Sequence, residues 1–220
     1  NVLTSDWGEY SPATKQSVFN YDVKLVNPKF TLTSDTLRYN TASKIANIVG
    51  PSNIEGDNNH IYSELGFYNT QIGQAELLNR SVLTNEGKQL VGDSLFYDRN
   101  KSFGEAFDNV VFTDTINKNQ LTGNYCYYNE QTKYAIATDS AMVVDYSQGD
   151  SLFLHGDTLQ LLTFFLDTDS MYRETRAFHK VRFFRTDIQG VCDSLVFSQK
   201  DTCLTMYRDP ILWNGNQQLL

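Results

Sequence analysis

One phrase of apolar and polar positions recurs along the chain. Its clearest copy is Leu90–Tyr97, in which a small residue and an acid lie between two leucines and an aromatic residue follows. The same pattern occurs at Leu32–Tyr39 and at Leu154–Leu161. Weaker copies occupy Ile61–Tyr68, Leu121–Tyr128, Gly190–Phe197 and Leu3–Tyr10. This self-similarity predicts a repeat architecture, in which each unit buries its apolar face against its neighbours.

The acidic or amide position of this phrase, here named the anchor, gives the period of the repeat. The anchors are Asp6, Asp35, Glu64, Asp93, Asn124, Asp157 and Asp193. Successive anchors are separated by 29, 29, 29, 31, 33 and 36 residues. These spacings indicate about seven copies of one unit, whose loops lengthen toward the C-terminus.

Each unit reads as two β-strands joined by a turn. The anchor phrase places Asp93, Leu95 and Tyr97 at alternating positions, which is the period of a strand. The polar stretch Asp98–Lys101 suits a turn. The β-branched and aromatic run Val110–Phe112 is typical of a second strand. No segment sustains a 3.6-residue period, so the pattern predicts an all-β protein of stacked antiparallel two-strand repeats.

The phase of the first strand changes at the anchor. Leu90 precedes Asp93 by three residues and Leu95 follows it by two, so strict alternation would place the two leucines on opposite faces. A small residue comes directly before the anchor at Ser5, Ser34, Gly92 and Gly156. We therefore expect a β-bulge or corner there that returns both leucines to the interior.

Stacking the units aligns equivalent positions into ladders. We expect one interior ladder of Leu37, Gly66, Leu95, Cys126, Leu159 and Leu195. A second is expected from Tyr10, Tyr39, Tyr68, Tyr97, Tyr128, Leu161 and Phe197. The anchors form a third ladder, in which like charges would repel unless each carboxylate accepts hydrogen bonds from backbone N–H groups at its own corner. Asn124 replaces the acid in one unit, which favours this structural reading over a calcium site.

Charge and cysteine content restrict the function further. The net charge is -8 and the pI is about 4.8, which argues against a nucleic-acid partner. The three cysteines, Cys126, Cys192 and Cys203, lack the spacing of a zinc site or a disulfide framework. We interpret them as buried or indifferent thiols, with a Cys192–Cys203 bridge as the alternative.

Gly92–Leu95 spells the signature of the GDSL serine hydrolases. In that family the serine lies between a strand and a helix near the start of the chain. Here the phrase lies in mid-chain, recurs with Thr in place of Ser, and is followed by a turn and another strand. We therefore predict that the protein is not an enzyme and has no catalytic residue.

Tandem units of the form Leu-x-Gly-Asp-x-Leu-x-Tyr, followed by a polar turn and an apolar strand, resemble the OstA-like, or LptA, family. These are periplasmic lipopolysaccharide-transport β-jellyroll proteins. The best matches are Leu90–Phe112, Leu32–Ile54 and Leu154–Leu161, and the resemblance extends from Leu3 to Leu220. It implies an elongated open β-jellyroll that forms a single domain over residues 1–220, which we expect to be truncated at both ends from a longer protein.

The resemblance also implies a function in the periplasm of the Gram-negative envelope. The protein would be a lipid-binding bridge or scaffold whose apolar groove shields the lipid A acyl chains of lipopolysaccharide. Its protein partners would be other β-jellyroll transport proteins, itself included, joined end to end by strand pairing. No cofactor, metal or nucleic acid is expected. The predicted groove residues are Leu37, Leu95, Tyr97, Val110, Phe112, Leu159, Val181, Phe183 and Leu195.

Three alternatives remain at this stage. The chain could be the N-terminal periplasmic domain of the outer-membrane lipopolysaccharide translocon. It could be a structural or adhesive β-solenoid whose core is wholly filled by its own side chains. A β-helix polysaccharide lyase would need clustered carboxylates and basic residues on one external face, which the pattern does not show.

Overall fold

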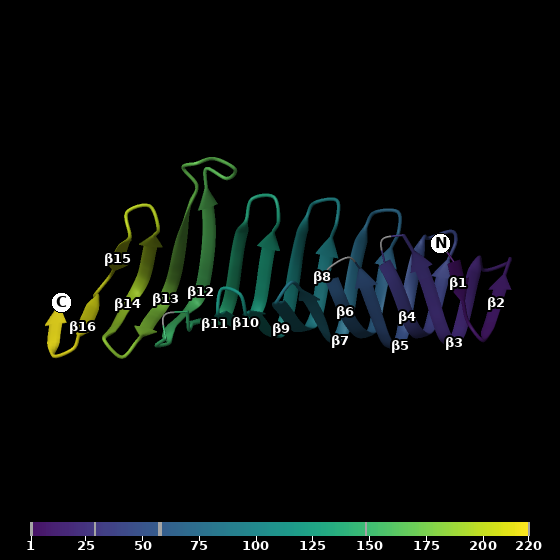
Figure 1. Ribbon diagram of the computed structural model, residues 1–220, viewed down its shortest axis with the longest axis horizontal. Helices are drawn as coiled ribbons and strands as arrows, with labels where there is room; N and C mark the ends of the chain where they lie inside the picture. Colours follow the sequence, from purple (N-terminus) through teal and green to yellow (C-terminus); the bar gives the residue numbers. More distant parts are fainter. Residues whose placement is uncertain (1, 29, 57–58, 148, 220) are drawn as a thin grey trace. The chain divides into compact units, whose positions relative to one another are not determined.

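The computed structural model describes residues 2–28, 30–56, 59–147 and 149–219. Within these ranges the secondary structure consists of β-strands without helix, so no described helix is of a length and apolarity that would cross a bilayer (Figure 1). The strands are β1 (Val2–Thr4), β2 (Trp7–Ser11), β3 (Gln16–Asn27), β4 (Phe30–Asn40), β5 (Ile45–Gly56), β6 (Asn59–Asn69), β7 (Gln74–Asn85), β8 (Lys88–Asp98), β9 (Phe103–Asp114), β10 (Asn119–Asn129), β11 (Tyr134–Asp145), β12 (Leu152–Phe164), β13 (Tyr172–Phe184), β14 (Ile188–Ser198), β15 (Cys203–Tyr207), β16 (Ile211–Asn214) and β17 (Gln217–Leu219).

The chain divides into two compact units, Asn1–Ala106 and Phe107–Leu220. In the first unit, each strand from β2 to β8 pairs antiparallel with the next in the chain, and β1 pairs with β3. In the second, β10 to β14 pair in the same way, β14 also pairs with β15 and β16, and β16 pairs with β17. The all-β antiparallel prediction is confirmed, whereas the repeat count and the single domain remain predictions.

Each long strand pair is interrupted near its middle by a bulge. Between β7 and β8, the register passes from Leu78 opposite Ser94 to Ser81 opposite Gly92. At this point two residues of β7, Asn79 and Arg80, lie opposite the single residue Asp93 of β8, so β7 carries one extra residue. Asn79 and Arg80 both have positive φ, at 62° and 59°. The same positive-φ pair recurs at Tyr21–Asp22, Asp108–Asn109, Asp139–Ser140 and His179–Lys180.

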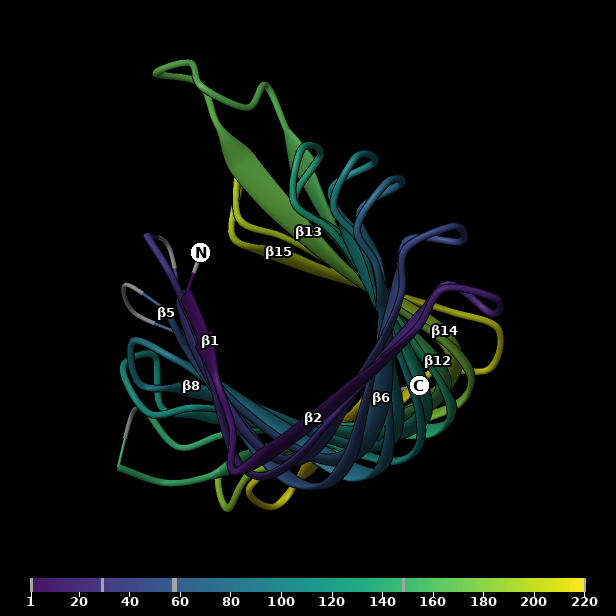
Figure 2. The same ribbon diagram turned by 90° about the vertical axis from the view of Figure 1, so that its right-hand side faces the viewer.

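The strands of each unit bend at these bulges, so that each sheet folds into two parts with one face on the inside (Figure 2). The predicted corner beside each anchor is confirmed, although the extra residue of each bulge lies in the partner strand. At the bulge between β4 and β5, the residue with positive φ is Gly50, at +88°. A Cβ atom added to Gly50 would lie 2.9 Å from the Cβ atom of Asp35. Glycine fits here because it adopts positive φ freely and because the anchor side chain occupies the adjacent space.

Polar side chains close the hairpin turns and link neighbouring repeats. Asn40 Oδ1 accepts the backbone N–H groups of Ala42 and Ser43, both at 2.9 Å. Asn69 and Asn129 form the same local turn. Backbone bonds such as Thr70 N–H to Lys44 O, 2.9 Å, then join each turn to the preceding one. The predicted polar turns are therefore part of the stacking between repeats.

Asp98 takes the place of asparagine in one of these turns. Gln74 donates a hydrogen bond to Asp98 Oδ2 at 2.9 Å, and Lys101 N–H donates to Oδ1 at 3.0 Å. These donors, with Gln74 as the largest contributor, hold the pKa of Asp98 below its usual value. The buried carboxylate thus stays charged at neutral pH and fixes the turn between β8 and β9.

Buried hydroxyl groups occupy the inside of the corner in the first unit. Ser34 and Ser52 share a hydrogen bond of 2.7 Å, and Ser81 donates to Ser63 at 2.9 Å. Each of these oxygens also lies within hydrogen-bond distance of a backbone carbonyl, so every one of the four hydroxyl groups has a partner. The second unit fills the equivalent positions without hydroxyl groups, using Ala141, Gly156, Val181 and Cys192.

The three cysteines are free, and their environments differ. Cys203 pairs with Ser198 in the β14–β15 ladder, whereas Cys192 lies six residues earlier on β14. At about 3.3 Å per residue the two cysteines are roughly 15–20 Å apart along the strand, beyond the reach of a disulfide. The Cys192–Cys203 bridge is therefore excluded by the register.

Thiol labelling at pH 8 is expected to modify Cys203 alone in the folded protein. Burial raises the pKa of Cys126 to about 11 and also raises that of Cys192, so both remain protonated and shielded, whereas Cys203 is exposed. A colorimetric disulfide reagent should titrate one thiol per chain natively and three after denaturation. Rapid native labelling of two or three thiols would contradict the packing described.

Candidate functional site

The inside of the bend, here named the interior face, carries the apolar clusters of each unit. In the first unit these are Val23, Leu32, Leu37 and Ile48 with their neighbours. In the second they include Leu159, Val181, Phe183 and Leu195. Residues opposite one another in an antiparallel ladder point to the same side, so the registers extend this face from strand to strand.

The first row on the interior face is the inner row. In the first unit it runs through Phe19, Leu37, Ile48, Gly66, Leu77 and Leu95. In the second it runs through Cys126, Ala137, Leu159, Ala177, Leu195 and Met206. Leu37, Leu95, Leu159 and Leu195 are only 2–6% exposed. Within each unit the first predicted ladder is thus confirmed, with the second strands contributing the residues in between.

The second row lies two residues further along each strand and is named the aromatic row. In the first unit it is Tyr10, Ser17, Tyr39, Ala46, Tyr68, Ala75 and Tyr97. In the second it is Tyr128, Ala135, Leu161, Thr175, Phe197 and Leu204. Within each unit this confirms the second predicted ladder. Tyr10, Tyr97 and Tyr128 are 51%, 38% and 43% exposed, so these three tyrosines are open to solvent although they share a face with the core.

A third row lies on the other side of the corner and is named the aliphatic row. In the first unit it is Leu3, Leu25, Leu32, Ile54, Ile61, Leu83 and Leu90. In the second it is Leu121, Val143, Leu154, Phe183, Gly190 and Leu212. Of this row, only Phe183 is among the predicted groove residues. Its signal was the first leucine of each phrase, which the corner returns to the interior.

The structure places the predicted groove residues on the interior face at different depths. Leu37, Leu95, Leu159 and Leu195 belong to the inner row, Tyr97 to the aromatic row and Phe183 to the aliphatic row. Val110 and Val181 lie at the corner, with 1% and 0% of their surface exposed, and Phe112 follows Val110 by two residues in β9. An apolar ligand would therefore contact the aromatic row before it reached the corner.

The anchor carboxylates face away from the interior, beside the positive-φ pairs. Arg80 donates to Asp93 Oδ1 at 3.0 Å. Asp193 accepts a hydrogen bond from Ser194 at 2.8 Å and lies 3.6 Å from His179 and 3.5 Å from Arg208. The Ser194 bond is the main cause of the lowered pKa of Asp193. These side-chain partners differ from the backbone N–H donors that the sequence led us to expect.

The described part of the chain holds no cluster of three or more His, Cys, Asp or Glu side chains able to bind a metal. The Gly92–Leu95 phrase lies within β8, where Ser94 pairs with Leu78 and the strand continues to Asp98. Ser94 faces away from Leu95 and the interior. This geometry differs from the strand-to-helix turn of a hydrolase serine, and it makes the interior face the main candidate site.

One comparison with known proteins identifies a family for this chain. A family model described as OstA-like protein matches residues 1–35 and 39–147. A search of curated proteins finds no match. Among matching solved structures is that of LptH from Pseudomonas aeruginosa, described as the LptA homologous periplasmic component of the lipopolysaccharide transport device. It is 14% identical, with 55% of this chain and 82% of that chain covered and a TM-score of 0.44.

Proposed function

Because the chain belongs to the OstA-like family, whose model matches more than half of its length, we propose that it is a periplasmic scaffold that binds lipid during lipopolysaccharide transport. The acyl chains would lie along the interior face. The observation that carries this proposal is the pair of apolar rows flanking the buried inner row, which continue across the strands of each unit.

The chemistry of these rows suits an acyl chain. The aliphatic row of the first unit consists only of Leu and Ile, and its members other than Leu32 keep part of their surface accessible. Each methylene group moved from water into such a surface gains about 0.8 kcal/mol. A saturated chain has no polar groups to satisfy, so a continuous hydrocarbon surface is sufficient for binding. Transport by this means requires affinity and a path, without catalytic residues.

The exposure of the aromatic row favours an open carrier over a filled structural solenoid. A wholly filled core would cover every side chain on the interior face. Instead, Tyr97 and Tyr128 expose 38% and 43% of their surface, while Leu95 beside Tyr97 exposes only 6%. The interior face thus has a closed side at the corner and an accessible side at the tyrosines.

Unpaired strand edges support assembly with similar domains. In the described registers β2 pairs only with β3, and β17 pairs only with β16. The residues of β17, Gln217–Leu219, are exposed. Open edges of this kind accept a strand from another chain. The proposal therefore includes end-to-end pairing with other β-jellyroll transport proteins or with a second copy.

Photo-crosslinking in cells tests the lipid path with a matched pair of positions. A photoreactive residue at Tyr128, exposed on the interior face, should form an adduct with lipopolysaccharide. One at Tyr127, the adjacent aromatic residue on the opposite face, should not. Adducts would be detected as a shifted band that reacts with an antibody to lipopolysaccharide. Equal labelling at the two positions, or none at either, would count against the carrier.

A further inference from the structure

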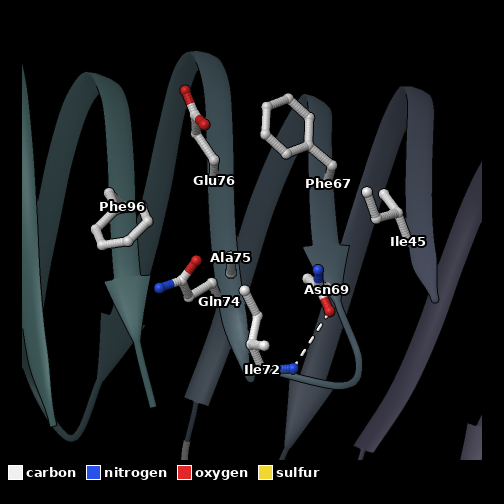
Figure 3. Close-up of a pocket in the computed structure, with 8 residues that line it drawn as sticks. All are labelled: Ile45, Phe67, Asn69, Ile72, Gln74, Ala75, Glu76 and Phe96. Carbon is white, nitrogen blue, oxygen red and sulfur yellow. Dashed lines mark hydrogen bonds between the residues drawn. The ribbon is translucent and has the colours of Figure 1, made fainter. Parts of the chain in front are cut away.

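A small pocket lies on the face of the first unit opposite the interior face, here named the exterior face. Its volume is about 180 Å³ (Figure 3). The lining residues are Ile45, Phe67, Asn69, Ile72, Gln74, Ala75, Glu76 and Phe96. Of these, Phe67, Glu76 and Phe96 share the exterior face, whereas Ala75 is the member that belongs to the aromatic row. The solvent side of an antiparallel sheet is normally polar, so aromatic and aliphatic side chains around a hollow on this face make it a candidate binding surface.

Two phenylalanines flank one carboxylate in this pocket. Glu76 of β7 lies directly opposite Phe67 of β6 on one side and Phe96 of β8 on the other. Figure 3 shows the two rings on either side of the strand that carries Glu76. Phe67 is 39% exposed, and Phe96 packs against Phe103 with ring centroids 5.8 Å apart. The Phe96 ring is therefore held in place by its contact with Phe103, whereas the Phe67 ring is accessible to solvent.

The other polar groups of the pocket are engaged in the fold, whereas the Glu76 carboxylate has no partner among the described residues. Asn69 Oδ1 accepts two turn N–H groups, and Gln74 donates to Asp98. No hydrogen bond or ion pair of Glu76 is found in the ranges that the structure covers. The pocket thus combines two aromatic rings with one available negative charge.

This arrangement is complementary to a cation that also stacks. Aromatic faces attract cations within about 6 Å of the ring centroid. A guanidinium group is planar, stacks on rings and pairs with a carboxylate through two parallel hydrogen bonds. The net charge of -8 adds a long-range attraction for a basic partner. We propose that this pocket binds an arginine side chain of a partner protein, independently of the lipid proposed for the interior face.

Fluorine NMR of the 220-residue protein labelled with 4-fluorophenylalanine tests this assignment. The resonances of Phe67 and Phe96 are identified by their loss in Phe67→Leu and Phe96→Leu. Titration with N-acetyl-arginine methylamide should shift both resonances saturably, while phenylalanines outside the pocket stay in place. Glu76→Gln should weaken binding at least about tenfold, because a charge-assisted pair is replaced by a neutral contact. Glu55→Gln, at an exposed acid outside the pocket, should leave binding unchanged.

Two further probes decide between the proposed ligand and others. The citrulline analogue has nearly the shape of the arginine probe without its charge, and it should leave both resonances in place. Equal binding of the two probes, or no shift with arginine, would overturn the proposal. Vesicles of phosphatidylethanolamine and phosphatidylglycerol provide amine headgroups. A response to these vesicles without one to arginine would assign the pocket to lipid and likewise reject the arginine site.

Discussion

Replacing Leu95 with Asp is expected to lower the free energy of unfolding by more than about 4 kcal/mol. Leu95 is 6% exposed in the inner row, opposite Leu77 on the adjacent strand. The substitution removes a buried apolar side chain and places a carboxylate among the apolar side chains of the inner row, so the two costs add. Since small folded domains are stable by about 5–15 kcal/mol in total, this loss removes a large share of the stability of the protein. Denaturant unfolding followed by circular dichroism measures the change.

Two control variants show whether the loss of stability depends on the facing of the residue and on the charge that is introduced. Ser94→Ala alters the neighbouring residue on the opposite face, and it should cost less than about 1 kcal/mol because its side chain lies outside the interior clusters. Leu95→Met conserves volume and should cost less than about 1.5 kcal/mol. A larger loss for Ser94→Ala than for Leu95→Asp would reverse the facing of β8 and, with it, the assignment of the inner and aromatic rows.

The features that could be predicted correctly from the sequence are those determined by the residues of a single repeat. The alternation of Asp93, Leu95 and Tyr97 indicates a strand by itself, and the change of phase between Leu90 and Leu95 already requires a bulge. Equal anchor spacing then aligns equivalent residues into the inner and aromatic rows. None of these inferences depends on which residue of the following strand lies opposite.

The features that were missed depend on the pairing between strands. The aliphatic row becomes continuous only when Ile54 and Leu83 of the second strands are set opposite Leu32 and Leu90. The exterior pocket exists only because Phe67 and Phe96 fall on either side of Glu76. Positive φ at Arg80 is likewise unexpected from residue type, since the left-handed region favours Gly, Asn and Asp. The positive φ of Arg80 follows from the bulge between β7 and β8, where the strand has to bend.

Gly66 shows where repeat similarity and packing give opposite expectations. Its equivalents in the inner row include Leu37 and Leu95, so a consensus argument would replace it with leucine to gain stability. The structure predicts the opposite. A Cβ atom at position 66 would lie 2.9 Å from Leu77 Cδ2, 3.0 Å from the backbone oxygen of Glu76 and 3.4 Å from Ile48 Cδ1. The space of the missing side chain is already filled from both neighbouring strands.

Gly66→Leu is therefore expected to destabilise the protein by about 2 kcal/mol or more, through overpacking. The second unit suggests the compensating change, because there Leu159 lies between Ala137 and Ala177 in the same row. Adding Leu77→Ala to Gly66→Leu should recover at least half of the loss, although Leu77→Ala alone removes buried surface and is destabilising. Chemical denaturation of the two single variants and the double variant measures this coupling. A gain in stability from Gly66→Leu alone would show instead that the inner row is underpacked at β6, and that room for a ligand extends to the inner row as well as to the aromatic row.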